Sequence, residues 1–238
     1  RRTGRADCMR HIRESNERMK SLHLICEGRI DVYNKRELPE EINIEDILSN
    51  LSSKIPSVFL DAIDSVYVGE FDSLRKREVD SVYQDGAIYI VPSYITGQED
   101  LARNIIHEIG HAVEEKYSLD IYGDGNIKDE FMKKRIKLLD NLKRLGYDIP
   151  SIELYMNPDY SKELDDYFYK EIGYPTLATL GSGVFVSPYG ITSLREYFAN
   201  VFEEFFLDGE IYAKKISPEA YNKIQNLQNK KLLRPLNR

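Results

Sequence analysis

The sequence predicts an α+β fold, with a small mixed sheet in the first half of the chain and a mainly helical second half. Short runs of alternating apolar residues occur before residue 92, whereas the segments after residue 98 follow a helical period. Strands followed by a run of helices are typical of the α+β class. The 238 residues, 42% of them hydrophobic, are enough to bury a sizeable core.

The strands are expected in three places. Residues 21–33 form a strand or hairpin around Glu27-Gly28, residues 65–71 alternate as a strand should, and residues 86–92 form a further strand that stops at Pro92. A polar helix is expected over residues 5–20 and a short helix over residues 44–51.

The second half is expected to contain a long amphipathic helix over residues 98–117, with further helices over 129–145 and 193–207. Pro218 begins a last helix, a position that suits proline. Residues 150–190 are rich in Tyr, Pro and Gly and are expected to form long loops around a short acidic helix near 161–171. We expect an N-terminal helical extension over residues 1–55 and one domain over residues 56–238.

Composition and charge exclude some functions. The formal net charge is −7, which argues against a general nucleic-acid binder. No apolar run approaches the ~20 residues of a membrane-spanning helix. The first 20 and the last nine residues are basic, so a weak contact with nucleic acid or a membrane surface stays a minor alternative to solvated termini. Two cysteines, Cys8 and Cys26, are too few for a disulfide scaffold.

The most informative segment is a pair of histidines four residues apart on the predicted helix 98–117. His107 and His111 share one helix face, so both imidazoles can reach one ion. Glu108 lies beside them and can take a proton from water. Zinc suits such a site because three protein ligands leave a position for water, whose pKa the metal lowers to about 7. The pattern H-E-x-x-H is typical of zinc metalloproteases; incidental histidines on a surface helix are the alternative.

The third ligand is expected to be a carboxylate downstream. The only other histidines, His11 and His23, lie in the N-terminal arm. Tyr117 stands where a metzincin has its third histidine, and Glu114 stands where that family has a glycine. The scarcity of histidine therefore directs attention to acidic side chains.

Glu196, on the predicted helix 193–207, is the preferred third ligand. This helix has a wide apolar face, and a polar stripe runs along it at Glu196, Asn200 and Glu203. Asn200 is expected to orient a ligating histidine by a hydrogen bond. One alternative stays open at this point, because Ser193-x-x-Glu196 also fits a capping box that closes the start of the helix.

These motifs together resemble the catalytic domain of anthrax lethal factor and the clostridial Pro-Pro endopeptidases of the same superfamily. The resemblance rests on His107-Glu108-x-x-His111, on Tyr189 seven residues before Glu196, and on Glu196-Tyr197-Phe198-Ala199. Residues 216–221, which precede the last helix, continue the match. The resemblance covers roughly residues 60–230, without visible similarity in the intervening loops.

The resemblance implies a zincin-like, gluzincin-like endopeptidase in which Zn²⁺ is bound by His107, His111 and Glu196. Glu108 is then the general base, and Tyr189 donates a hydrogen bond to the oxyanion of the tetrahedral intermediate. The family usually carries a second glutamate where this chain has Asn200, which implies a less basic ligand set and weaker metal binding.

The expected substrate is a protein or peptide. Residues 87–91 are expected to be the sheet edge to which it adds as an extended strand. Residues 180–185 can be read equally as a mobile cleft wall or as a plain turn. The substrate preference itself lies in loops that do not align with the family.

The main functional hypothesis is a zinc endopeptidase; the alternative is a non-catalytic zincin-like module that binds or builds a larger assembly. The chain begins at Arg1 and not at Met, so we expect one unit of a longer polypeptide. A secreted toxin, a delivered effector or a virion component is favoured over a resident cytoplasmic enzyme.

Overall fold

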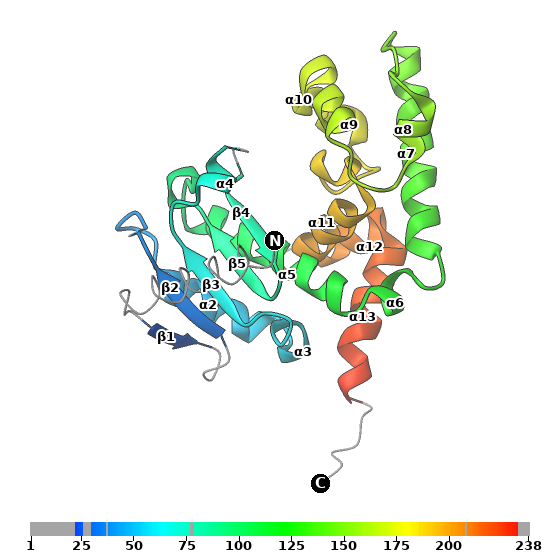
Figure 1. Ribbon diagram of the computed structural model, residues 1–238. Coiled ribbons are helices and arrows are strands. Elements are labelled where there is room, and N and C mark those ends of the chain that lie inside the picture. Colours follow the sequence, from blue (N-terminus) through cyan, green and yellow to red (C-terminus); the bar gives the residue numbers. More distant parts are fainter. Residues whose placement is uncertain (1–21, 26–29, 37, 77–78, 208, 233–238) are drawn as a thin grey trace, which may run out of the picture. The chain divides into compact units, whose positions relative to one another are not determined.

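The computed structural model describes residues 22–25, 30–36, 38–76, 79–207 and 209–232 (Figure 1). The predicted helix 5–20, Cys8, Cys26 and residues 233–238 lie outside these ranges. The chain forms two compact units, residues 1–108 and 109–238, and the boundary between them falls inside one continuous helix.

The first unit contains a five-stranded mixed sheet in the order β1-β2-β3-β5-β4 (Figure 1). Its strands are β1 (Leu22–Ile25), β2 (Ile30–Asn34), β3 (Ser65–Val68), β4 (Ser81–Gln84) and β5 (Ala87–Ile90). β1 pairs antiparallel with β2, the strands β2, β3 and β5 run parallel, and β4 returns antiparallel to β5. The small mixed sheet predicted from the sequence is therefore confirmed.

The two faces of the sheet differ in chemistry because side chains alternate along each strand. One face presents Val32, Val66 and Ile88, which are buried. The other face presents a tyrosine from each of the same strands, Tyr33, Tyr67 and Tyr89, whose rings stack at 4.8 and 5.2 Å between centroids. Because these rings lie face to face, the stack contributes to pairing of the parallel strands.

Helices connect the strands. A parallel pair needs a crossover, and α2 (Ile44–Lys54) and α3 (Ser57–Leu60) lie in the crossover from β2 to β3. Asn43 caps α2 by accepting hydrogen bonds from the backbone N–H groups of Glu45 and Asp46. The short helix α4 (Asp72–Arg75) follows β3, and the 3-10 turn η1 (Pro92–Tyr94) follows β5. The predicted helix 44–51 is thereby confirmed.

β4 and β5 form a hairpin whose turn is Asp85-Gly86. Both residues have positive φ, 50° and 84°, as a type I′ turn requires. The expectation that residues 87–91 form the sheet edge is wrong, because β5 lies between β3 and β4 and the edge strand is β4. A four-residue strand with Ser and Gln at its ends offers too short a pattern to be recognised from sequence.

Part of the expected N-terminal helical extension belongs to this sheet. Residues 22–34 supply β1 and β2, and β2 pairs with β3 over four residues. The compact units are divided within the helix α5. The hydrogen bonds of a strand need a partner strand, which explains why these residues join β3 and do not form a separate element.

The second unit is helical. α5 (Gln98–Lys116) runs into it from the first unit, and it is followed by the elements α6 (Ser118–Tyr122), α7 (Asn126–Arg144), α8 (Ile152–Met156), α9 (Lys162–Tyr167), the π-helical turn η2 (Phe168–Ile172), α10 (Tyr174–Gly181), η3 (Tyr189–Ile191), α11 (Leu194–Phe206), α12 (Glu210–Ile216) and α13 (Pro218–Leu232). The predicted long, amphipathic helices at 98–117, 129–145 and 193–207 are confirmed within a few residues. So is the last helix, which begins at Pro218.

The segment 150–190 is more helical than expected. It holds α8, α9, η2 and α10 in place of long loops around one helix. Ser151 and Ser161 cap α8 and α9 by accepting hydrogen bonds from the N–H groups of Leu154 and Leu164. Helices of only five to eight residues lack the long apolar period by which helices are recognised.

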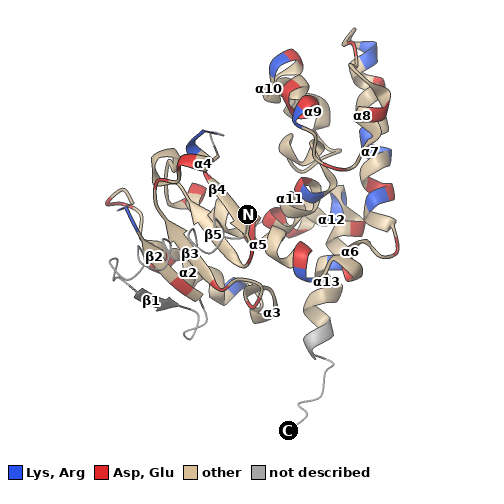
Figure 2. Cartoon of the chain, viewed as in Figure 1, with Lys and Arg blue, Asp and Glu red and all other residues tan. Residues whose placement is uncertain are grey.

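Figure 2 shows Lys and Arg interleaved with Asp and Glu along α7, which is the usual pattern of a helix with a solvated face. Within the described ranges, no helix combines the length and the apolar character needed to cross a bilayer.

Candidate functional site

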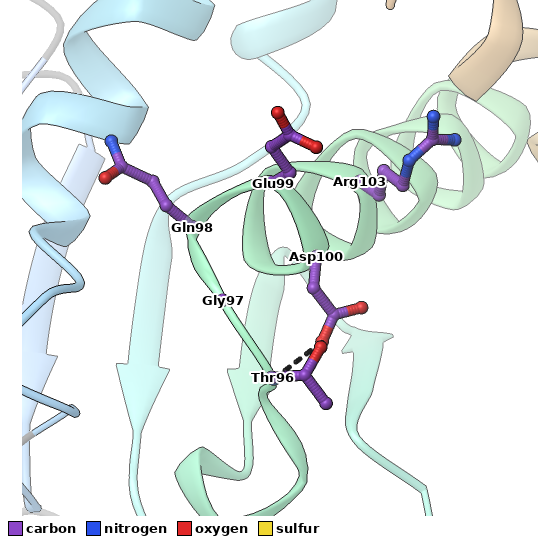
Figure 3. A pocket seen from close by; sticks show the side chains of 6 residues that line it. All are labelled: Thr96, Gly97, Gln98, Glu99, Asp100 and Arg103. Atoms are coloured by element: carbon purple, nitrogen blue, oxygen red, sulfur yellow. Dashed lines mark hydrogen bonds between the residues drawn. The ribbon is translucent and has the colours of Figure 1, made fainter.

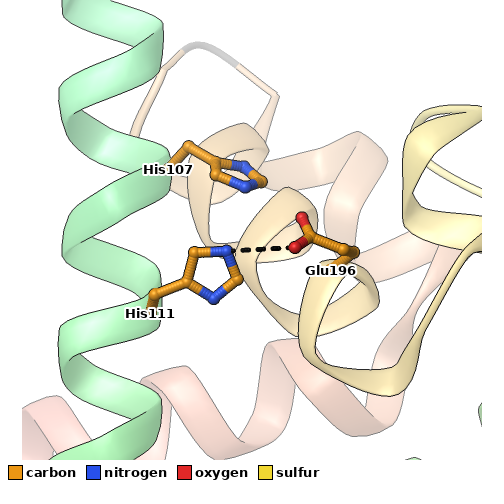
Figure 4. Close-up of side chains that lie close together, drawn as sticks. All are labelled: His107, His111 and Glu196. Atoms are coloured by element: carbon orange, nitrogen blue, oxygen red, sulfur yellow. Dashed lines mark ion pairs between the residues drawn. The ribbon is translucent and has the colours of Figure 1, made fainter. Parts of the chain in front are cut away.

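The helix α5 positions the two motif histidines. Its apolar residues Leu101, Ile105 and Ile109 are buried, so that face of the helix is fixed by packing. His107 and His111 are half-buried and project from the same side of the helix, one turn apart (Figure 4). Since α5 is continuous, its own hydrogen bonding keeps the two imidazoles in register.

Glu196, in the first turn of α11, completes a group of three potential ligands. One ligand atom each from His107, His111 and Glu196 lies within 4.8 Å of the others, and Figure 4 shows the glutamate facing both imidazoles. Among the described residues, these three are the group of His, Cys, Asp or Glu side chains whose ligand atoms lie close enough together to hold one metal ion.

The chemistry of the donor set, and the distance between one pair of its atoms, fit a zinc ion. His111 Nε2 lies 3.4 Å from Glu196 Oε1, which is longer than a good N–H···O hydrogen bond. Ligand atoms bonded to one tetrahedral zinc at about 2.0–2.1 Å lie about 3.3 Å apart. Two imidazoles and one carboxylate are also the ligand set of many catalytic zinc sites, in which water takes the fourth position.

A second carboxylate lies on the other side of His111. Glu114 Oε2 lies 3.5 Å from His111 Nδ1, and the Glu114 side chain is buried. A histidine that ligates a metal through one ring nitrogen usually donates a hydrogen bond from the other to such a carboxylate. This bond fixes the orientation of the ring and its tautomer. The sequence analysis did not assign this role to Glu114. The i, i+3 spacing from His111 on one helix was the signal available.

Glu114 is itself held in place. Arg195 Nε donates to Glu114 Oε2 at 2.9 Å, and the Tyr122 hydroxyl donates to Oε1 at 2.8 Å. Burial alone would raise the pKa of Glu114, but its hydrogen bonds with His111, Arg195 and Tyr122 and the charge of Arg195 outweigh it and lower the pKa. The carboxylate is therefore ionised at neutral pH and able to accept from His111.

Gly110 allows α5 and α11 to approach closely. A Cβ atom at this position would lie 3.1 Å from the Cα of Ala199 and 3.3 Å from the Cβ of Phe202. A side chain here would require the neighbouring part of α11 to shift by a few tenths of an ångström. The glycine inside the H-E-x-x-H motif thus helps to set the distance between His111 and Glu196.

Glu108 points to the sheet. It is 5% exposed, and its two carboxylate oxygens accept from Ser81 Oγ at 2.9 Å and from the Tyr83 backbone N–H at 2.6 Å. Both partners belong to the edge strand β4, so this strand fixes the orientation of the carboxylate. Each carboxylate oxygen has a second lone pair with which it can accept a further hydrogen bond.

Tyr189 begins η3, the 3-10 turn directly before α11. Its side chain is 41% exposed, and its ring packs edge-on against Tyr174 at 6.2 Å between centroids. The Tyr174 hydroxyl is in turn fixed by Asp165 Oδ1 at 2.6 Å. Tyr189 is therefore held through its neighbours on a partly exposed surface; its proposed contact with a reacting oxyanion stays a prediction.

The prediction that Asn200 orients a ligating histidine is wrong, because both ends of its amide form hydrogen bonds with other groups. Its amide nitrogen donates to the Glu196 carbonyl at 2.7 Å, and its amide oxygen accepts from Ser187 Oγ. Asn200 therefore ties the start of α11 to the segment before η3, and the carboxylate of Glu114 lies beside the imidazole instead. A polar stripe on α11 did not reveal which way each side chain points.

The Ser193–Glu196 motif caps α11 through Ser193, and the ligand role of Glu196 stays a prediction. Ser193 Oγ accepts from the Glu196 backbone N–H at 3.1 Å, so Ser193 caps α11. The Glu196 carboxylate is nevertheless directed at His111. Backbone capping and side-chain ligation use different atoms of Glu196 and are compatible.

Residues 180–185 form a turn at the end of α10. The backbone N–H groups of Val184 and Phe185 both donate to the Gly181 carbonyl, and Gly183 has a φ of 71°. Phe185 is buried and contacts Phe131 and Tyr197. The buried ring anchors the turn.

A separate surface hollow lies at the N-terminus of α5 (Figure 3). It is lined by Thr96, Gly97, Gln98, Glu99, Asp100 and Arg103. Asp100 Oδ2 accepts from both the backbone N–H and the hydroxyl of Thr96 at 2.9 Å. This is a helix cap, and it lies about 15 Å along α5 from His107.

No family model matches the chain, and the searches found no similar curated protein and no similar solved structure.

Proposed function

We propose that the protein is a zinc-dependent endopeptidase with a zincin-like fold. The observation that carries this proposal is the group His107, His111 and Glu196, with the carboxylate of Glu114 behind one of its imidazoles. An ion pair that merely stabilises helix packing needs neither a second imidazole nor a buried carboxylate on the far nitrogen. The resemblance to lethal factor and the Pro-Pro endopeptidases supports the same activity.

Each group of the site has its own role in the proposed reaction. When bound, zinc polarises the scissile carbonyl and makes water acidic enough to act as a nucleophile at neutral pH. Glu108 takes a proton from the attacking water and delivers it to the leaving amine. Its hydrogen bonds to Ser81 and Tyr83 hold the carboxylate in one orientation. Preorganisation of this kind saves reorientation during the reaction.

Tyr189 is proposed to stabilise negative charge on the carbonyl oxygen. A phenol placed beside the developing oxyanion contributes most in the transition state, because the charge is largest there. The substrate is proposed to be a peptide in extended form that pairs with the edge of β4. Because β4 also holds Glu108, a peptide at that edge passes next to the proposed base.

The alternative function is a non-catalytic module that uses the same fold for binding. One observation favours it: both oxygens of Glu108 already accept hydrogen bonds from β4, as a purely structural glutamate would. In that case the metal group joins α5 to α11, and Glu108 fastens α5 to the sheet.

Digestion of a proteome-derived peptide library separates the two functions. We expect the zinc-loaded full chain to cleave peptides, a chelator to abolish cleavage, and Glu108→Gln to lower the rate by at least about 100-fold. The matched control is Glu115→Gln, an exposed carboxylate on the same helix, which should cleave as wild type does. Full zinc occupancy without any cleavage would favour the non-catalytic module, and a chain that binds no zinc would contradict both.

A further inference from the structure

A completely buried arginine lies at the centre of the second unit. Arg135, on α7, is 0% exposed. Its guanidinium makes five hydrogen bonds, all to backbone carbonyls. Burial of a charge is costly, so a residue of this kind needs a structural or functional reason.

The five hydrogen bonds join two distant segments. On one side, Nε and Nη2 donate to the Ile191 carbonyl at 3.0 and 2.7 Å, and Nη2 also donates to the Thr192 carbonyl at 2.7 Å. On the other side, Nη1 donates to the carbonyls of Tyr155 and Asn157 at 2.7 and 2.6 Å. Each pair of carbonyls lies at the C-terminal end of a short helix, η3 or α8, where intrahelical donors run out.

The environment keeps Arg135 charged and rigid. Burial lowers its pKa to about 10, which still leaves it protonated at neutral pH. Its guanidinium lies 4.7 Å from the ring centre of Phe131, and the Tyr155 hydroxyl donates to the Arg135 carbonyl at 2.9 Å. Arg135 and Tyr155 therefore hold each other through backbone and side chain at once.

The segment that Arg135 holds carries two residues of the candidate site. Ile191 follows Tyr189 by two residues, and Thr192 precedes Glu196 by four. η3 is a single 3-10 turn of three residues, which is too short to be stable without outside contacts. The position of Tyr189 therefore depends on what fixes the Ile191 and Thr192 carbonyls.

We propose that Arg135 is a positioning residue that fixes η3 and the start of α11, and with them Tyr189 and Glu196. The inference rests on the proposed peptidase function for its kinetic consequence. Its structural consequence, an ordered segment 189–196, can be measured without any activity. Displacement of a catalytic group by about 1 Å can cost on the order of 100-fold in rate, so a residue outside the site can control it.

The test compares Arg135→Lys with wild type in the full chain. Lysine keeps the charge but its compact ammonium cannot reach both pairs of carbonyls. The first readout is hydrogen exchange of the metal-free protein. We expect exchange at the amides of residues 190–196 to rise about 10-fold or more, with α13 unchanged, because the local opening becomes easier. The matched control, Arg144→Lys, alters an exposed arginine of the same helix. It should change exchange neither at residues 190–196 nor in α13.

The second readout is kinetic. Arg135→Lys should lower kcat by about 10- to 100-fold with little change in KM, since it disturbs orientation more than binding. In a Tyr189→Phe background the same substitution should cost less, because one of the two groups that Arg135 positions is already gone and only the contribution through Glu196 remains. A general loss of stability would cost the same in both backgrounds.

Three results would overturn the proposal: unchanged exchange at residues 190–196, a uniform rise over the whole second unit, or full additivity with Tyr189→Phe. If Arg135→Lys does not fold, Tyr155→Phe replaces it. That variant removes the hydroxyl bond to the Arg135 carbonyl and keeps the guanidinium, and it should raise exchange at residues 190–196 by a smaller factor. If wild type hydrolyses no peptide, the proposed function fails while the exchange result still decides the role of Arg135.

Discussion

Two carboxylates face the imidazole of His111, one on each ring nitrogen. Glu196 lies on the Nε2 side, at the spacing of a shared metal, and Glu114 lies on the Nδ1 side. Glu114 also accepts a hydrogen bond from Arg195. The charge of Glu114 is thus balanced by a cation of the protein itself.

Replacement of Glu114 by glutamine should weaken zinc binding without removing a ligand. The amide is neutral and no longer raises the basicity of His111, so we expect the Kd for zinc to rise about 10- to 100-fold. Competition with a chromophoric chelator measures this. The control is Glu115→Gln, the exposed neighbour, and an equal loss of affinity in both variants would contradict the assignment of Glu114.

Two helices, α5 and α11, supply the candidate ligands, and Gly110 governs their distance. In a solvent-exposed helix Gly→Ala stabilises by up to about 1 kcal/mol. Here the added methyl group would meet the backbone of Ala199 at 3.1 Å. Helix propensity and packing therefore act in opposite directions at this position.

We expect Gly110→Ala to lower the free energy of unfolding by about 1–3 kcal/mol, because overpacking outweighs propensity. Zinc affinity should fall as well. Urea unfolding of the metal-free chain gives the first quantity. Gly97→Ala is the control, since nothing lies within 4 Å of a Cβ at that position. A stabilised Gly110→Ala variant with unchanged zinc affinity would show that the close approach has no role.

A half-buried lysine joins α7 to the C-terminal helices. Lys134 Nζ donates to the Tyr197 hydroxyl, the Ile216 carbonyl and Ser217 Oγ at 2.5, 2.6 and 2.9 Å. Burial lowers the pKa of Lys134 to about 8, although the nearby Glu130 carboxylate acts in the opposite direction. In the unfolded chain the pKa of a lysine is about 10.4.

This difference predicts a pH dependence. Between pH 8 and pH 10 the unfolded chain binds more protons at Lys134 than the folded chain, so the free energy of unfolding rises with pH. The contribution of this residue is about 2 kcal/mol between pH 8 and pH 9.5. Urea unfolding across this range should show it in wild type and in the exposed control Lys137→Met. Lys134→Met should lack this rise in the free energy of unfolding. If Lys134→Met shows the full rise, the assignment to Lys134 is refuted.

On the scale of the whole molecule, the long periodic elements and the grouping of the candidate ligands were predictable. α5 was predicted because its apolar residues repeat at helical spacing over five turns. His107, His111 and Glu196 were predicted because a fixed motif on one helix and a shortage of histidine left few candidates. Their proximity in the structure agrees with that expectation.

The remaining features depend on tertiary contacts that no local pattern reports. β4 is an edge strand that exists through its hairpin with β5, and α8 to α10 are too short for a periodic signal. Arg135 was missed because an arginine on an amphipathic helix ordinarily faces solvent. Asn200 was assigned to the wrong partner because spacing on α11 fixes the face of a side chain, and not its hydrogen bonds.

The central claim is that His107, His111 and Glu196 bind one zinc ion. Native mass spectrometry of the zinc-titrated full chain tests it most directly. We predict one zinc per wild-type chain, loss of that ion in Glu196→Gln and in His111→Ala, and retention in Glu203→Gln, a carboxylate elsewhere on α11. A wild-type chain without zinc, or a His111→Ala/Glu196→Gln double variant that still binds one equivalent, would contradict the account.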